Sequence, residues 1–157
     1  VVRNLDRADI IINIQGDEPL IDPDNIDDLV DAFRDEKVEM STIISRKLSG
    51  KDLVDSNIVK VLVDEKCYGI NFKRTIFDME ISEIYRHIGL YGFRKKTLLF
   101  YSSLSPTTSE LAHNWEQLRA LDNGIKIKTI LTDKIYQSVD TPEDLKEIKL
   151  SVDPENF

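Results

Sequence analysis

The chain has 157 residues, of which 41% are hydrophobic and 32% charged, and this composition suits one soluble globular domain with a sizeable core. Its net charge of −8, with no window dense in Lys or Arg, argues against a nucleic-acid backbone or an anionic membrane surface as a partner. No apolar run reaches the length of a membrane span and the N-terminus has no signal-peptide pattern, so we expect a cytoplasmic protein.

The first predicted element is a buried strand that ends in a polar turn. Residues 10–14 hold four isoleucines broken only by Asn13, a pattern typical of a strand buried on both faces of a parallel sheet. Ligands of such sheets collect at the carboxyl ends of the strands, and here residues 15–19 form that end. Gly16 would let a ligand approach the backbone, and Asp17 is the first candidate for a metal ligand. Acidic turns are also common on protein surfaces, so the pattern by itself leaves both interpretations of Asp17 open.

An amphipathic helix is predicted after this turn, and a core strand after the helix. Asp22 is the expected N-cap and Pro23 the first helical residue. The apolar stripe of this helix is formed by Ile26, Leu29, Val30 and Phe33. Residues 40–44 then form the next core strand, and residues 50–56 form a polar loop or a short helix.

An antiparallel hairpin is predicted in the middle of the chain. Its strands are residues 58–63 and 68–72, and the turn between them contains Cys67, the only cysteine. A single cysteine excludes an intramolecular disulfide and fits a reducing compartment. Arg74 follows the second strand, where it could either present positive charge to a ligand or lie in solvent.

The strand predicted at residues 85–94 combines binding candidates with glycines. Alternation places His87, Gly89 and Tyr91 on one of its faces. Glycines such as Gly89 and Gly92 weaken a strand and usually mark a bulge or a surface that something approaches closely. A single histidine in a strand is more often structural, but the neighbouring Gly89 favours a binding role for His87.

The longest helix predicted in the last third spans residues 109–121. A shorter helix is expected before it, at residues 95–103. The pair Glu116 and Gln117 lies in the longer helix, which Asn123 and Gly124 end. Its core stripe is formed by Leu111, Trp115 and Leu118.

A strand and a terminal helix complete the chain. Residues 125–131 alternate between apolar and polar and form the strand, and residues 135–139 lead to Asp140. Asp140 or Thr141 caps a helix that Pro142 begins, so Asp140 has an ordinary structural role besides any chemical one. Within this helix, the residues expected to pack inward are Leu145 and Ile148.

The order of these elements predicts an α/β fold in a single domain, residues 1–157, with a mostly parallel sheet and an antiparallel hairpin insertion.

The chain has no nucleophilic triad spacing, no zinc-like Cys/His cluster and no phosphate-loop glycine motif. What remains is a pair of aspartates at strand ends, Asp17 and Asp140. Carboxylates that converge at one edge of a sheet can hold Mg²⁺, whose other ligands are often substrate phosphates. Phosphoryl or nucleotidyl transfer is the reaction class that fits.

Segments spread over almost the whole chain resemble one enzyme family. They are QGDEP at residues 15–19 with LIDP at 20–23, YRHIGLY at 85–91, WEQLRALDNG at 115–124 and VDTPEDL at 139–145. In this order they are similar to the 3-deoxy-manno-octulosonate cytidylyltransferases, the CMP-Kdo synthetases of lipopolysaccharide biosynthesis. The QGDEP turn also resembles turns of related nucleotidyltransferases, whereas the HIGxY and EQLRAL segments are more selective.

The resemblance implies a Rossmann-like nucleotidyltransferase sheet with helices on both faces, and a homodimer. It implies transfer of CMP from CTP to the anomeric hydroxyl of 3-deoxy-manno-octulosonate (Kdo), with release of pyrophosphate and with Mg²⁺ held by Asp17 and Asp140. The sugar acid would be contacted by Gln15, Arg74, His87, Tyr91, Glu116 and Gln117. Arg74 and His87 suit the carboxylate of the sugar, and residues 116–117 suit its hydroxyl groups.

The chain also departs from the family pattern. Such enzymes begin with a strand and a phosphate-gripping loop of the PARxxSxRxPGK type, which is absent from these 157 residues. We therefore expect the chain to correspond to the carboxyl-terminal part of the enzyme, inactive alone and with an open sheet edge. Residues 112–114 depart as well, because a more acidic or serine-bearing segment is expected before EQL. The alternatives are a cytidylyltransferase for a sialic acid or amino-Kdo, and a sugar-binding or assembly fragment without turnover.

Overall fold

The strands and helices lie close to the positions that the apolar pattern predicts. A computed structural model describes residues 7–74, 84–139 and 141–152. Its strands are β1 (Ile10–Asn13), β2 (Met40–Ser45), β3 (Lys60–Val63), β4 (Tyr68–Lys73), β5 (Ile84–Arg94) and β6 (Ile127–Thr132). Its helices are α1 (Pro23–Asp31), the 3₁₀ turn η2 (Ala32–Arg34), α2 (Gly50–Val54), α3 (Lys95–Tyr101), α4 (Thr108–His113), α5 (Glu116–Asp122) and α6 (Pro142–Val152).

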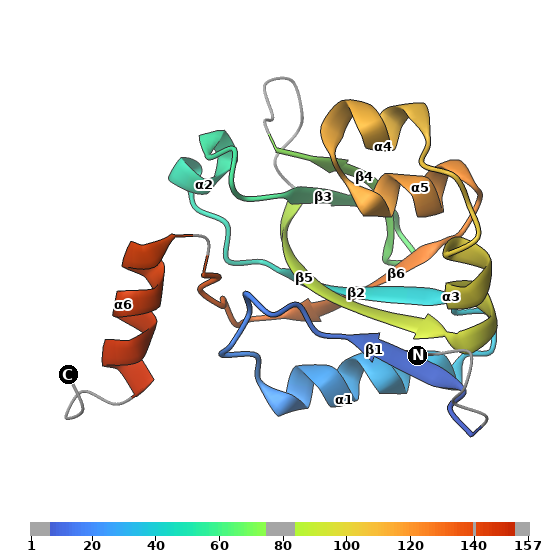
Figure 1. Ribbon diagram of the computed structural model, residues 1–157, viewed down its shortest axis with the longest axis horizontal. Coiled ribbons are helices and arrows are strands. Elements are labelled where there is room, and N and C mark those ends of the chain that lie inside the picture. The colour runs from blue at the N-terminus through green and yellow to red at the C-terminus, as the bar shows by residue number, and fades with distance from the viewer. Residues whose placement is uncertain (1–6, 75–83, 140, 153–157) are drawn as a thin grey trace.

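The six strands form one mixed sheet in the order β1-β5-β2-β6-β4-β3. Because β3 also pairs with β5, the sheet closes on itself as a barrel, and β1 extends from β5 at the side (Figure 1). Among the described strands only β2 and β6 run parallel, whereas the pairs that involve β1, β3, β4 and β5 are antiparallel. The predicted α/β class and hairpin are confirmed, but the prediction of a mostly parallel sheet is wrong.

Strand β1 differs most from its prediction. It pairs with β5 alone, antiparallel, in a register that sets Ile10 opposite Arg94 and Asn13 opposite Tyr91. Its isoleucines are only partly buried, and Ile14 beyond its end is 50% exposed. A short apolar run therefore does not by itself indicate a central parallel strand, because an edge strand packed on one face carries the same residues.

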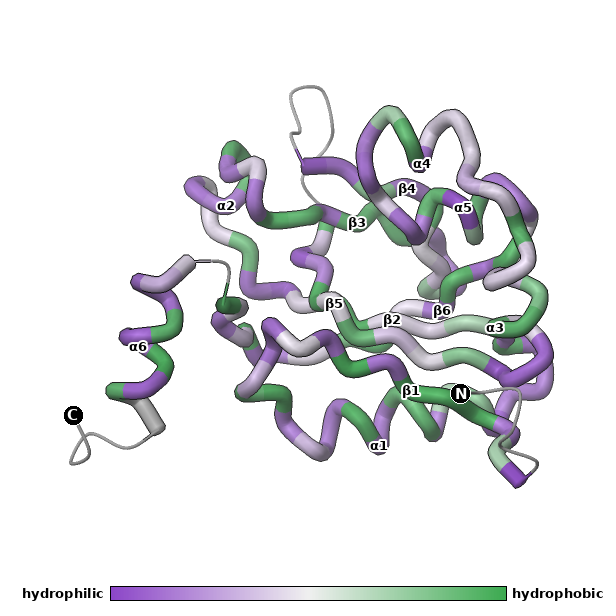
Figure 2. Tube along the Cα trace, viewed as in Figure 1, coloured by the Kyte–Doolittle hydropathy of each residue, from purple (hydrophilic) through white to green (hydrophobic). Residues whose placement is uncertain are grey.

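Two apolar clusters, one on each face of β2, form the core. Ile43 points to one cluster with Leu29 of α1 and Leu90 of β5. Ile44 points the opposite way, to a cluster that includes Trp115 and Ile127. Helix α1 thus covers one side of the sheet and the α3–α5 region the other (Figure 1). Hydrophobic and hydrophilic residues alternate along α1 in Figure 2, as expected for a helix with one buried face.

Local capping chemistry explains where the first and last helices begin. The Asp22 carboxylate accepts the Asp24 N–H at 2.9 Å and Pro23 follows it, as predicted. Thr141 caps α6, because its hydroxyl accepts the Asp144 N–H at 3.1 Å. Leu145, expected to pack inward, is 43% exposed. None of the helices in the described residues is long and apolar enough to cross a membrane.

The helix predicted at residues 109–121 is in fact two helices. Asn114 adopts the left-handed conformation at φ 55° and Trp115 is extended, so α4 ends and α5 begins anew. Asparagine tolerates this conformation better than most residues, which makes it an acceptable helix end. The break turns Leu111 out to 66% exposure, against the prediction, and buries Trp115. It also places residues 116–117 at the start of α5.

Close packing around Gly92 generates a stability prediction. A Cβ at Gly92 would meet Ser41 Oγ at 2.6 Å, Phe33 at 2.7 Å and Ile12 at 3.2 Å. We expect Gly92→Ala to lower the free energy of unfolding by roughly 1–3 kcal/mol, because β5 would have to shift against α1 and its 3₁₀ extension. Urea unfolding checks this. Gly50→Ala is the control, because no atom lies within 4 Å of its Cβ position, and equal stability of the two variants would contradict the packing.

Candidate functional site

A pocket of about 620 Å³ joins segments that lie far apart in the sequence. The predicted site residues that line it are Gln15, Asp17, Arg74, His87, Tyr91, Glu116 and Gln117. Asp140 lies outside the described residues. On either side of it, Ser138 and Thr141 line the same pocket, and the Val139 N–H donates to the Asp17 carbonyl at 2.8 Å. The fold therefore brings the Asp17 turn together with the segments on either side of residue 140.

The turn after β1 forms an open part of the pocket wall. The Glu18 N–H donates to the Gln15 carbonyl at 3.2 Å, which closes the turn and leaves Asp17 exposed. No atom lies within 4 Å of a Cβ position at Gly16. The Gln15 side chain lies 3.7 Å from the corresponding position at Gly89, so β5 and the turn meet here. This arrangement leaves space for a ligand beside the backbone, as predicted.

The predicted bulge in β5 is confirmed and shapes the pocket floor. Thr42 of β2 opposes Tyr91, but the next residue, Ile43, opposes Ile88, so residues 89–90 are left out of the register. His87 and Tyr91 keep the same face, with ring centroids 5.4 Å apart. Burial lowers the pKa of His87 from its usual 6.5 to about 4 and raises the pKa of Tyr91. Both side chains are therefore neutral at pH 7.

A cluster of cations lies where β3, β4 and β5 meet. Lys60 is only 1% exposed, and its ammonium donates to the carbonyls of Asp55 at 2.5 Å and Arg74 at 2.6 Å. The Arg74 guanidinium donates to the Ser56 carbonyl at 2.8 Å. Arg86 opposes Lys60 across the β3–β5 pair and also lines the pocket. Sequence reasoning missed Arg86 because strict alternation placed it on the face opposite His87.

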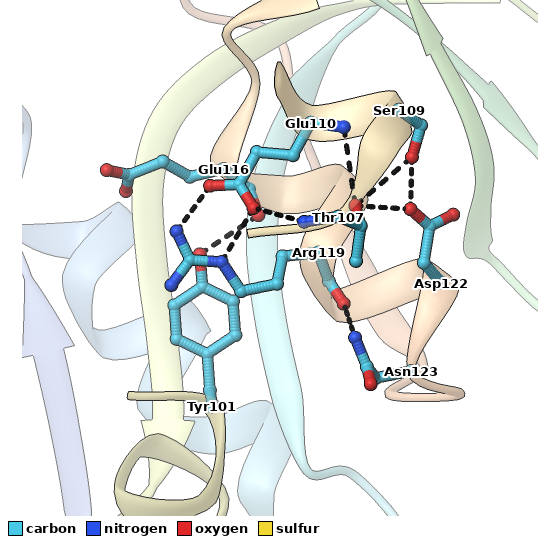
Figure 3. Close-up of polar contacts among 8 residues, drawn as sticks. All are labelled: Tyr101, Thr107, Ser109, Glu110, Glu116, Arg119, Asp122 and Asn123. Carbon is cyan, nitrogen blue, oxygen red and sulfur yellow. Dashed lines mark hydrogen bonds and ion pairs between the residues drawn. The ribbon is translucent and has the colours of Figure 1, made fainter. Parts of the chain in front are cut away.

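A polar network holds α5 against α3 and α4 (Figure 3). The Arg119 guanidinium donates to both oxygens of the buried Glu110, through Nε at 2.7 Å and through Nη2. The guanidinium carbon of Arg119 lies 5.0 Å from the centroid of the Tyr101 ring. The Tyr101 hydroxyl donates to the Glu116 carbonyl at 2.9 Å. In Figure 3 the Glu116 side chain points away from this network. The network therefore fixes the first turn of α5 and leaves the Glu116 carboxylate free to contact a ligand in the pocket.

Hydrogen bonding and burial set the ionisation of this network. The bonds from Arg119 lower the pKa of Glu110, and pairing with Glu110 raises the pKa of Arg119. Burial raises the pKa of Tyr101 to about 12, so its hydroxyl keeps its proton and can donate. Beside them, Asp122 accepts hydrogen bonds from the hydroxyls of Thr107, at 2.6 Å, and of Ser109.

The described residues do not form an all-protein metal cage. No group of three or more His, Cys, Asp or Glu side chains in the part of the chain that the structure describes is placed to hold a metal ion. Carboxylates of Asp17, Glu18 and Asp144 nevertheless line the pocket. Mg²⁺ usually takes one or two carboxylates and completes its shell with water and substrate phosphates. The donor set therefore fits Mg²⁺ that arrives with a phosphate ligand.

Comparison with known proteins decides the family. The model of the cytidylyltransferase family matches residues 1–127. The chain belongs to the cytidylyltransferases. This membership agrees with the α/β sheet, whose arrangement is shared by more distant nucleotidyltransferases. One is the inositol-1-phosphate CTP transferase from T. maritima, with a TM-score of 0.60 over 92% of this chain at 24% identity.

Closer relatives confirm the resemblance to CMP-Kdo synthetases. The 3-deoxy-manno-octulosonate cytidylyltransferase of Thermodesulfovibrio yellowstonii is 40% identical over 153 residues, which cover 91% of this chain and 60% of the relative. That of Chlorobium phaeobacteroides is 42% identical over 151 residues, covering 91% and 61%. A CMP:2-keto-3-deoxy-manno-octonic acid synthetase solved with CTP superposes with a TM-score of 0.87 at 30% identity, over 96% of this chain and 65% of that one. The cytidylyltransferase chain thus spans about 60% of the length of these curated relatives.

The ion pair in Figure 3 generates a prediction about stability. Arg119→Met leaves the Glu110 carboxylate buried without its guanidinium partner, so we expect the free energy of unfolding to fall by roughly 2–3 kcal/mol. Chemical denaturation measures the loss. Arg34→Met is the matched control, because its pair with Asp31 is exposed and should be worth less than about 0.5 kcal/mol. Similar losses in the two variants would contradict the role of burial.

The lowered pKa of His87 generates a prediction about pH. The unfolded chain binds a proton at His87 near pH 6.5 and the folded chain only near pH 4, so acid favours unfolding between these values. We expect His87 to lower the free energy of unfolding by about 3 kcal/mol as the pH falls from 6.5 to 4. Urea unfolding midpoints of the wild type and of His87→Asn, measured from pH 4 to pH 8, test this. The midpoint of the wild type should fall more steeply toward acid pH than that of the variant. Parallel profiles would contradict the lowered pKa of His87.

Proposed function

We propose that the chain forms the sugar-acid side of an enzyme that transfers CMP from CTP to the anomeric hydroxyl of Kdo and releases pyrophosphate. The observation that supports this most is the pocket. Side chains from the segments that resemble the family, far apart in sequence, line one cavity of about 620 Å³. A volume of this size is within the range of small-molecule sites. The similarity to named CMP-Kdo synthetases supports the same substrates.

The charges of the pocket suit an acidic sugar. Although the chain carries a net charge of −8, Arg74 and Arg86 line the pocket and the buried Lys60 lies behind them. Cationic guanidinium groups bind carboxylates through charge-assisted hydrogen bonds. We therefore place the sugar carboxylate toward this end of the pocket, with Arg74 as its main partner.

The remaining polar side chains suit an array of hydroxyl groups. Gln15 and Gln117 each offer a donor and an acceptor, and Glu116 offers acceptors. Tyr91, with its raised pKa, keeps a hydroxyl proton to donate. These groups bind and orient the sugar so that its anomeric hydroxyl faces the phosphate of the nucleotide. Holding two reactants in place in this way supplies much of the rate enhancement in such transfers.

Mg²⁺ is the proposed cofactor, held by Asp17 and Asp140. When bound, it would neutralise charge on the α-phosphate and lower the pKa of the attacking hydroxyl, so that no strong protein base is required. Asp17 is exposed on the pocket wall, where a hydrated cation can reach it. The hydrogen bond between residues 139 and 17 supports a shared location for the two chain segments.

The wider role follows from the same proposal. We place the enzyme in lipopolysaccharide biosynthesis in the cytoplasm, as a homodimer that uses the β3–β4 hairpin region as its interface. Two alternatives concern the substrate, a sialic acid or amino-Kdo, and both keep the chemistry unchanged. A third is a sugar-binding or assembly fragment without turnover, which the 60% coverage of the relatives favours for this chain alone.

Activity on a panel of sugar acids tests the substrate. The full-length protein is incubated with CTP, Mg²⁺ and either Kdo, amino-Kdo or a sialic acid, and pyrophosphate release is measured. We expect the highest kcat/KM for Kdo, and preference for a nine-carbon acid would contradict the assignment. The 157-residue chain is examined in parallel by calorimetry, where heat with Kdo but none with CTP is expected.

Substitution of Asp17 tests the metal assignment in the same protein. Asp17→Asn should lower kcat by roughly 100-fold or more, because the loss of metal-assisted charge stabilisation costs several kcal/mol. Asp27→Asn is the control, because this exposed aspartate of α1 lies outside the pocket and should leave kcat unchanged. A near-normal rate for Asp17→Asn would remove the residue from the metal site.

A further inference from the structure

The two nitrogens of His87 lie in different surroundings. Nε2 is 2.9 Å from the hydroxyl oxygen of Thr42. Nδ1 makes no hydrogen bond with any residue that the structure describes, and the imidazole lines the pocket. The ring packs edge-on against Phe72 and beside Tyr91, with centroids 5.3 Å and 5.4 Å away. Which nitrogen carries the proton therefore decides whether a ligand meets a donor or an acceptor at Nδ1.

The hydroxyl proton of Thr42 is already in use. Thr42 is fully buried, and its hydroxyl lies 2.9 Å from the Leu90 carbonyl and 3.4 Å from the Ile88 carbonyl. A threonine hydroxyl has one proton to donate. With that proton directed to either carbonyl of β5, the oxygen faces His87 with a lone pair. Nε2 must then be the donor in the contact between them.

The bulge in β5 explains why the backbone needs this proton. Residues 89–90 have no partners in the registers of β5 with β1 or β2. Leu90 is only 1% exposed, so its carbonyl requires a donor from within the protein. If the Thr42 hydroxyl turned to His87 instead, this carbonyl would lose its hydrogen bond from Thr42. The backbone irregularity therefore dictates the direction of the hydroxyl.

We propose that Thr42 is a positioning residue, which holds His87 as the Nε2–H tautomer so that Nδ1 accepts a hydrogen bond from a hydroxyl group of the bound sugar. The choice of a sugar hydroxyl as the donor rests on the proposed function, whereas the tautomer does not. An imidazole in this form cannot donate from Nδ1 to a carboxylate. The sugar carboxylate is thus left to Arg74, in place of the sharing with His87 that the sequence suggested. The lowered pKa of His87 agrees, because it keeps the ring neutral.

Nitrogen NMR of the imidazole rings reads the tautomer directly. The chain has two histidines, so a sample labelled with ¹⁵N-histidine gives two ring patterns, and the exposed His113 serves as an internal reference. For wild type at pH 7 without ligand, we expect an Nε2–H pattern for His87 and averaged tautomers for His113. A protonated ring or an Nδ1–H pattern for His87 would overturn the proposal, and this readout needs no variant.

Substitutions of threonine separate the role of Thr42 from general packing. Thr42→Val should shift the His87 pattern toward mixed tautomers, and Thr42→Ser should restore it. Thr129→Val is the matched control, because Thr129 is a buried neighbour in the β2–β6 register whose hydroxyl donates to the Cys67 carbonyl at 2.9 Å. An unchanged His87 pattern in folded Thr42→Val would overturn the proposal.

Addition of Kdo tests the assigned hydroxyl contact. We expect the Nδ1 signal of His87 to move in the direction of an accepted hydrogen bond while the Nε2 proton stays in place. In the full-length protein, Thr42→Val should raise KM for Kdo about tenfold with little change in kcat, the effect of one weakened hydrogen bond. Bound Kdo that leaves Nδ1 unmoved overturns the contact. If Kdo does not bind at all, the proposed function fails, and the ligand-free spectra still decide the tautomer.

Discussion

The antiparallel pairing of β5 with three other strands is the interaction on which the fold and the pocket depend. Its first residues pair with β3, most of its length pairs with β2 and its last residues pair with β1. These contacts close the sheet, because β3, at the end of the strand order farthest from β1, also pairs with β5. The same strand supplies His87 and Tyr91 to the pocket. The strand that closes the sheet therefore also forms part of the site.

Two buried polar side chains beside the pocket, Lys60 and Thr42, are satisfied by backbone carbonyls. Lys60 donates to two carbonyls and Thr42 to a third, and the exposed Arg74 donates to the Ser56 carbonyl. Such bonds remove the large cost of burying a donor without a partner, and they leave little freedom to the loops that they join. Burial of charge thus serves here to hold the pocket walls at fixed positions, and the Glu110–Arg119 pair does the same for α5.

Local patterns in the sequence predicted most of the elements, whereas the resemblance to the family supplied most of the predicted site residues that line the pocket. The caps Asp22 and Thr141 and the glycines of β5 carry their own chemistry, so their effects can be inferred without knowledge of the fold. The break at Asn114 was missed, although the Thr107 and Glu110 capping box and the asparagine were signals of a short helix. A continuous apolar stripe concealed it, because Leu111 matched the helical period without being buried.

The sequence by itself determined where strands and helices form, because apolar periodicity and capping depend on residues only a few positions apart. It also determined the family, because the matching segments can be compared directly. Only the tertiary structure decided that β1 lies at an edge, that nearly all pairings are antiparallel and that Lys60 is buried. It alone set the hydroxyl of Thr42 against His87. These features arise from contacts between residues distant in sequence, whose partners a local pattern does not specify.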